Sequence, residues 1–271
     1  MDVEFWGVRG TSPVCGRDQV RHGGGTACAS LTPASNHLLV IDAGTGIRGL
    51  GGHLVRTGAG GPLDLALFLT HFHLDHIIGF PFFAPVYSPE ATITIYAAAE
   101  PEETEKHLGG LMAGRNFPLE LSETPSRKTY RQIGEEGLVV GGVKISICPL
   151  RHPQGCVAYK FEERGRSVIF ATDTEHPEEG TDEVLVSFCR NASHLVYDAM
   201  YTVEEYAAGR KGWGHSTWQA GTRVARAAGV QNLVLSHFNP DHSDGKVDEI
   251  VSLARRVFPR TVAAHPGMKI R

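Results

Sequence analysis

A short run of histidine and aspartate side chains, His71-Phe72-His73-Leu74-Asp75-His76, constrains this chain more than any other feature. It directly follows Leu65–Thr70, whose apolar sequence LALFLT is typical of a strand covered on both faces of its sheet. Imidazoles and carboxylates are the side chains that bind zinc and other first-row divalent ions. A histidine-rich loop without an ion is the alternative, but such a loop has no need of three imidazoles beside an aspartate. The sequence therefore predicts a metal site at the end of a buried strand.

Strand-like and helix-like segments alternate along the rest of the chain, which predicts an α/β fold. Two sheets sandwiched between helices suit this order. With 271 residues, one domain spanning 1–271 is expected. The least regular long stretch is Pro101–Gly134, which we interpret as a lid or an insertion near the site. The expected strands are Val3–Val8, His37–Asp42, Leu65–Thr70, Thr92–Tyr96, Val139–Cys148, Cys156–Phe161, Ser167–Ala171, His194–Asp198 and Asn232–His237, and the expected helices are Glu102–Met112, Asp182–Asn191, Thr217–Ala228 and Lys246–Phe258.

Composition narrows the class of protein. The formal net charge of -4 argues against a non-specific binder of polyanions, which usually carries a basic face. Five cysteines occur without a Cys-x-x-Cys pair, which favours reduced thiols in a cytosolic protein over a cysteine zinc site. The first residues show no signal-peptide pattern, and no apolar run has the length of a membrane span. We therefore expect a cytoplasmic protein without a membrane partner.

The histidine-rich run has partners elsewhere in the chain. HFHLDH matches the HxHxDH motif of the metallo-β-lactamase superfamily, and further segments resemble the later motifs of that superfamily in the expected order. The resemblance covers essentially the whole chain. The matching residues are Asp42 in IDAG, His152 in LRHP, Asp173 in FATDT and His237 in LSHF.

The resemblance implies a four-layer αββα sandwich with two metal ions at one edge of its sheets. One ion would be held by His71, His73 and His152, and the other by Asp75, His76 and His237. Asp173 would bridge them together with a water, while Asp42 would support the ligands from behind. Two cations on one water lower its pKa toward neutrality and make a hydroxide available, and Asp75 and Asp173 would position it. Zinc is the expected metal from the ligand types, with manganese or iron as alternatives.

A further motif, Gly214-His215-Ser216-Thr217, precedes an expected helix. It resembles the histidine-serine/threonine motif of ribonuclease Z and its phosphodiesterase relatives. The resemblance implies that His215 is not a metal ligand but assists the departing oxygen of a phosphodiester. Asp198, in VYDA, would orient it, since a carboxylate on one imidazole nitrogen raises the basicity of the other. The alternative is structural, with His215 capping the following helix.

Weaker candidates lie at both ends of the chain. Arg9 and Thr11 stand in a glycine-rich segment and are possible phosphate contacts. His242 and Asp244 follow His237 in a stretch that also resembles bacterial phosphodiesterase-like members. A position near the metals is one interpretation of that pair, and a solvated turn is the one we favour.

The substrate class follows from a departure from the family pattern. Ribonuclease Z carries a long tRNA-gripping arm between the third-motif histidine and the bridging aspartate, whereas 20 residues separate His152 from Asp173 here, enough for a hairpin. We therefore expect hydrolysis of a small phosphodiester, such as a cyclic nucleotide or a cyclic phosphate. A tRNA 3′-end endonuclease with RNA as partner and a non-catalytic binding protein on the same scaffold remain alternatives. The resemblance is also compatible with a homodimer.

Overall fold

The computed structural model describes residues 1–57 and 63–271, whose strands form two seven-stranded sheets. The first sheet has the strand order β14-β1-β2-β3-β4-β5-β6. From the centre of this sheet to one edge, the strands β3, β4, β5 and β6 run parallel to one another. The bounds are β1 Asp2–Gly7, β2 Cys28–Thr32, β3 Leu38–Ile41, β4 Leu63–Phe68, β5 Ala91–Ala97, β6 Arg127–Gln132 and β14 Lys269–Ile270.

The second sheet has the order β13-β12-β11-β10-β9-β8-β7. Here β10, β11, β12 and β13 are parallel, whereas β7, β8 and β9 form an antiparallel meander. The bounds are β7 Leu138–Val140, β8 Val143–Leu150, β9 Cys156–Glu163, β10 Arg166–Ala171, β11 His194–Asp198, β12 Asn232–Ser236 and β13 Thr261–Ala263.

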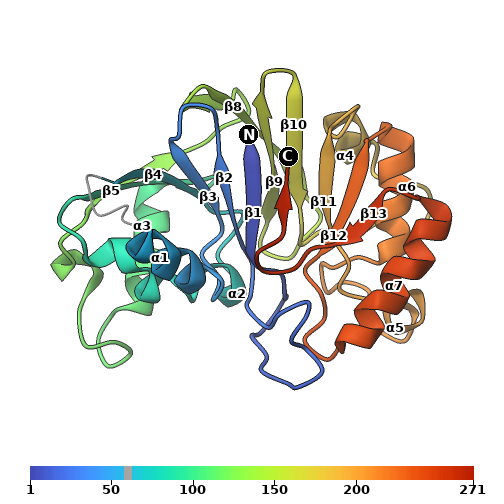
Figure 1. The fold of residues 1–271 in the computed structure, drawn as a ribbon, viewed down its shortest axis with the longest axis horizontal. Helices are drawn as coiled ribbons and strands as arrows, with labels where there is room; N and C mark the ends of the chain where they lie inside the picture. The colour runs from blue at the N-terminus through green and yellow to red at the C-terminus, as the bar shows by residue number, and fades with distance from the viewer. Residues whose placement is uncertain (58–62) are drawn as a thin grey trace.

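Helices cover the outer face of each sheet. Figure 1 shows α1 and α3 outside the first sheet, and α4, α6 and α7 outside the second. This is the four-layer αββα sandwich that the sequence predicts, and the prediction of the fold is confirmed. The α-helices are α1 Ile47–Arg56, α2 Leu74–Ile77, α3 Pro101–Leu111, α4 Glu183–Phe188, α5 Val203–Ala207, α6 Trp218–Ala228 and α7 Asp244–Val257, and the 3₁₀ turns are Phe80–Phe82, Ala84–Tyr87 and Leu121–Glu123.

The later part of strand β4 is apolar because both faces of its sheet are covered at this position. Successive strand residues point to opposite faces. Leu65 and Leu67 pack in the cluster beneath α1 and α3, whereas Ala66 and Phe68 pack in the cluster between the sheets. Phe68 meets Tyr159 of the second sheet edge-on, with ring centroids 5.5 Å apart. The rigid core thus fixes the end of β4, from which the histidine-rich run begins.

One expectation for local structure is wrong. Val139–Cys148 is not one strand, because Gly141 and Gly142 both adopt positive φ (56° and 81°) and turn the chain between β7 and β8. The segment 101–134 contains α3, where the sequence predicts a helix, and then β6, which the sequence does not predict and which pairs in parallel with β5 at the sheet edge. Among the described residues, no helix combines the length and apolar character needed to cross a membrane.

Candidate metal centre

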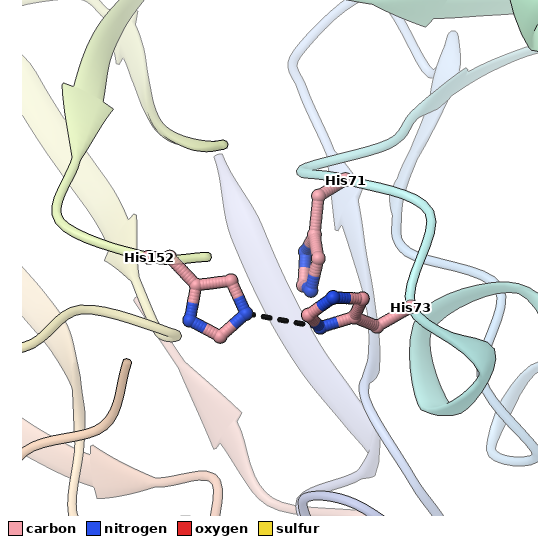
Figure 2. A group of neighbouring side chains, drawn as sticks. All are labelled: His71, His73 and His152. Atoms are coloured by element: carbon pink, nitrogen blue, oxygen red, sulfur yellow. Dashed lines mark hydrogen bonds between the residues drawn. The ribbon is translucent and has the colours of Figure 1, made fainter. Parts of the chain in front are cut away.

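Three histidines from both halves of the molecule converge at one end of the sandwich. His71 and His73 follow β4, and His152 follows β8. Figure 2 shows their rings turned toward one another, and His152 Nε2 lies 3.0 Å from His73 Nδ1. One nitrogen from each ring can be chosen so that all three lie within 4.8 Å of one another. This trio is the first of three such groups among the described residues; the third, Asp173, Asp198, His215 and His237, shares two members with the second.

The second group consists of Asp75, His76, Asp173 and His237, all buried. Nε2 of His76 and Nε2 of His237 face each other at 3.2 Å, and each lies 3.2 to 3.4 Å from Oδ2 of Asp75. Zinc–ligand bonds of about 2.0–2.1 Å in a tetrahedron place neighbouring donors about 3.3 Å apart. The spacing of this quartet is therefore that of a metal coordination shell.

Asp173, a member of the quartet, lies between the trio and the other three residues of the quartet, and directs one carboxylate oxygen toward each. Its Oδ1 is 3.9 Å from Nε2 of His71 and 3.9 Å from Nε2 of His152. Its Oδ2 is 3.2 Å from Nε2 of His76 and 3.3 Å from Nε2 of His237. This division of the two oxygens is the arrangement expected of a carboxylate that bridges two ions.

The charge and hydrogen bonding of the site fit cations. Nε2 of His71 is buried without a hydrogen-bond partner among the described residues, although buried polar atoms rarely lack one. Four carboxylates, Asp42, Asp75, Asp173 and Asp198, are buried close together, and burying uncompensated charge is costly. Two divalent cations would match the charge of these four groups.

The protonation of the histidines leads to the same conclusion. Burial, assisted by the charge of His76, lowers the pKa of His71 to about 2, so its ring is neutral, as a ligand must be. Burial also disfavours a charged His76, but Asp173, Asp75 and Asp42 outweigh that effect and raise its pKa well above the ordinary value. The carboxylates thus attract positive charge to this point, which a metal ion can supply in place of a proton.

Outer partners fix which nitrogen of each ring faces the centre. Nδ1 of His76 donates to Oδ2 of Asp42 at 2.8 Å, and Nδ1 of His152 donates to the carbonyl oxygen of Gly214 at 2.8 Å. Nδ1 of His71 lies 3.0 Å from Oγ1 of Thr70, which in turn bonds Asp42. Such partners set the tautomer and orientation of metal-binding histidines. The three Nε2 atoms are thereby left free to accept a metal.

Beside Asp173 lies the pair of His215 and Asp198. Nδ1 of His215 is 3.0 Å from Oδ2 of Asp198 and 3.8 Å from Oδ1 of Asp173. Burial lowers the pKa of His215, but the charge of Asp198 and the hydrogen bond to it outweigh this and raise that pKa to about 9. The helix α6 is capped by Thr217, whose Oγ1 accepts from Ala220 N, so His215 is not needed as the cap.

Asp198 is held by three backbone amides. Its Oδ1 accepts from the amides of Met200 and Ser216, and its Oδ2 accepts from the amide of Asp173, each at 3.0 Å. The carboxylate is fully buried and therefore cannot swing away. It can both orient His215 and fix the backbone of Asp173.

Several site residues occupy the left-handed region of backbone conformation. Asp42, Asp173 and His237, which follow β3, β10 and β12, have φ of 58°, 59° and 58°. Such values are uncommon outside glycine and cluster at functional sites. The chain turns sharply where each strand ends, which directs these side chains across the end of the sandwich and toward one point.

The weaker candidates behave differently from expectation. Arg9 is fully buried and donates to the carbonyl oxygens of Gly23, Asn239 and His242, so it organises loops and is not a phosphate contact. Thr11 is exposed, and its backbone amide donates to Oδ2 of Asp75 at 2.7 Å.

The favoured interpretation of His242 and Asp244 as a solvated turn is wrong, because both are buried. His242 lies 2.9 Å from a carboxylate oxygen of Glu205. Asp244 accepts from the backbone amides of Arg21 and His22. Both residues tie loops together outside the two donor groups.

Two supporting residues were missed from the sequence. Oε1 of Gln154 lies 3.1 Å from Nε2 of His73, and Gln154 itself has a positive φ of 62°. Glu175 accepts from the hydroxyl of Tyr206 (2.6 Å) and from the amides of Gly212 (2.7 Å) and Gly214 (2.9 Å). Glu175 therefore holds the loop that supplies the carbonyl for His152. Neither residue belongs to a recognisable motif, and only the fold brings them to the site.

Comparison with known proteins decides the family. Residues 37–238 match the family model described as beta-lactamase superfamily domain. The chain belongs to this superfamily. Among curated relatives, ribonuclease BN of Cronobacter sakazakii is 26% identical, with 89% of this chain and 92% of the relative aligned.

Solved structures show the same fold. The metallo-beta-lactamase fold protein YhfI from Bacillus subtilis has a TM-score of 0.73 at 21% identity, covering 99% of this chain and 98% of its own. A diphosphatase from the PhnP family has a TM-score of 0.70 at 17% identity, covering 100% of this chain and 97% of its own. Membership of the superfamily and the clustered histidine and aspartate donors together support the use of divalent metal.

Proposed function

We propose that this metal-dependent hydrolase cleaves a phosphodiester bond in a small substrate, such as a cyclic nucleotide or a cyclic phosphate, using two divalent ions. Zinc is the first choice because its usual ligands are those present here. The observation that carries the proposal is the position of Asp173, with one oxygen toward each group of donors and the Asp198–His215 pair at its side. The trio and the quartet would each hold one ion.

When bound, the ions supply a hydroxide nucleophile at neutral pH and positive charge for the phosphoryl oxygens. The protein groups then divide the remaining work. His215, protonated at neutral pH because of Asp198, can give a proton to the departing oxygen. Asp75 accepts from the amide of Thr11, which keeps its carboxylate in place at the reacting centre.

The preference for a small substrate rests on the hairpin between His152 and Asp173. Strands β9 and β10 are joined directly at Arg164 and Gly165 and pair along their length, which leaves no arm to grip a folded RNA. The net charge of -4 also gives little attraction to a polyanion. A second candidate, cleavage at the 3′ end of precursor tRNA, is favoured by the relative named ribonuclease BN.

A substrate panel on metal-analysed protein tests the proposal. We expect about two metal ions per chain, and metal-dependent hydrolysis of bis(p-nitrophenyl) phosphate and of at least one cyclic nucleotide or cyclic phosphate. His215→Ala should keep its metal but lose about 10²–10⁴-fold in kcat, the usual contribution of a general acid. His265→Ala, at an exposed histidine, serves as the matched control.

The outcomes separate the candidates. Cleavage of precursor tRNA with a steep salt dependence, without activity on the small substrates, would favour the second function. Metal binding with no turnover on any of these phosphodiesters would contradict both and support a binding protein on the same scaffold.

A further inference from the structure

A cavity of about 640 Å³ lies beside the metal-binding trio, and His71 and His73 form part of its wall. It is enclosed by the ends of β4 and β5, the first turns of α3 and the loop between β8 and β9. Its volume falls in the range of small-molecule sites, about 300–1,000 Å³. We call it the apolar cavity, because Ala97, Ala98 and Val157 contribute to a largely hydrocarbon wall.

Away from the metal-binding trio, the charge of the apolar cavity disfavours an anionic occupant. Among the described residues that line it there is no lysine or arginine, and its single carboxylate is Glu103, which lies 3.8 Å from Nε2 of His107. A second cavity, which His152 lines, differs because Arg151 and Lys211 also line it. An anion placed in the apolar cavity would lose its hydration and meet Glu103 without gaining a cationic partner.

Two aromatic side chains, Phe72 and His107, line one wall of the apolar cavity. The rings of Phe72 and His107 are stacked, with centroids 4.3 Å apart and planes inclined by 11°. Phe72 is half-buried and His107 is exposed, so this stacked pair is open to a ligand. Aromatic rings favour offset stacking or edge-to-face contact with another ring. A planar substituent would therefore gain both apolar burial and a ring contact.

We propose that the apolar cavity binds an uncharged planar aromatic group on one ester arm of the substrate, while the phosphate lies at the metal centre. This inference rests on the proposed phosphodiesterase function and specifies its substrate class. The arm is adjacent to the phosphate because His71 and His73 belong both to the trio and to the cavity wall. An aryl ester or a nucleoside ester has this chemistry, whereas an ester with a charged arm does not.

The test compares the binding of two probes, phenylphosphonate and methylphosphonate, to metal-loaded protein by calorimetry. Burial of a phenyl ring contributes about 1.5–3 kcal/mol, so phenylphosphonate should bind about tenfold more tightly or better. Ala98→Trp, which replaces a small lining side chain with an indole and narrows the cavity, should abolish this preference and leave the affinity for methylphosphonate and the metal content unchanged. Ala113→Trp, an exposed alanine beyond the end of α3, is the matched control.

A second variant guards against a misfolded Ala98→Trp protein. His107→Ala removes half of the stacked pair at an exposed position and should weaken phenylphosphonate about three- to tenfold, with no effect on methylphosphonate. Equal affinity of wild type for the two probes, or an unchanged preference in both variants, would overturn the assignment of the cavity. The proposed function fails separately, if metal-loaded wild type hydrolyses no phosphodiester.

Discussion

Asp42→Asn tests whether the carboxylate behind the ligands sets the metal-binding tautomer of His76. Asp42 is 3% exposed. Its Oδ1 accepts from the backbone amide of Thr70 at 2.9 Å, and its Oδ2 accepts from Nδ1 of His76 at 2.8 Å. Asparagine has nearly the same shape and also tolerates the positive φ of this position. Any effect therefore reports on hydrogen bonding and charge.

The amide of Asn has one acceptor, whereas two N–H donors point at this side chain. If its oxygen faces Thr70, its NH₂ group faces His76, which must then give up the proton on Nδ1 and carry it on Nε2, where it blocks the metal. If the oxygen faces His76, the NH₂ group meets the amide of Thr70. The first orientation therefore places the wrong tautomer of His76 at the metal, and the second leaves a buried donor without an acceptor, which costs about 1–3 kcal/mol.

We expect the loss of this partner to reduce zinc affinity about 10- to 100-fold, or about 1.4–2.7 kcal/mol. The assay is competition with a chromophoric chelator, together with urea unfolding in the absence of metal. Asp64→Asn, at a carboxylate 66% exposed, is the control and should change stability by less than about 0.5 kcal/mol. A folded Asp42→Asn protein with wild-type zinc affinity would refute the reasoning.

Three further predictions concern other parts of the site. The pKa of His215 is raised to about 9, and bound cations would lower it again. We therefore expect kcat to decrease with rising pH at some point between about pH 6.5 and 9, where His215 loses its proton. The pH–rate profile of His215→Ala should lack this decrease. Burial raises the pKa of Glu175, but its bonds to Tyr206 and to the amides of Gly212 and Gly214 outweigh this and lower it. The stability that the charge of Glu175 provides is therefore present above the unfolded pKa of about 4.5 and is lost as the pH falls through the lower folded pKa. Glu175→Gln should therefore unfold at a lower urea concentration than wild type at pH 7. Equal urea midpoints for the two proteins at pH 7 would contradict this role. Chelation should lower the melting temperature by about 5–10 °C if free metal is near 100 times its Kd, as scanning calorimetry with and without EDTA can measure, and an unchanged melting temperature would argue against metal stabilisation.

The sequence predicted which residues converge at the site, but it did not predict all the elements around them. The run His71–His76 and the motifs of Asp42, His152, Asp173 and His237 stand out because their spacing and order resemble one superfamily. The structure brings all of them together, along with the predicted pair of Asp198 and His215. Their roles as ligands and catalytic groups stay predictions until metal is measured.

Some elements could not be predicted because tertiary packing overrides their local preference. Helix α1 has the sequence IRGLGGHLVR, and glycines make a poor helix, yet burial of Ile47 and Leu50 stabilises it. Strand β6 has the sequence RKTYRQ and lies at a sheet edge, so it lacks the apolar alternation of a half-buried strand.

Supporting contacts were equally invisible in the sequence. Glu175 acts on Gly212 and Gly214, which lie 37 and 39 positions further along the chain. Gly214 itself is required by geometry, since its φ is 80° and a Cβ there would overlap the ring of His152. Only the folded chain reveals that these residues are neighbours.

The origin of the donors in two different sheets has a consequence for assembly. The segment containing His71 to His76 leaves the first sheet, whereas His152, Asp173 and His237 leave the second. Neither half of the polypeptide therefore carries a full coordination sphere, and high affinity for an ion can arise only after the sandwich has closed. Bound ions would then act as cross-links between the halves, and we expect free metal to shift the folding equilibrium toward the native form.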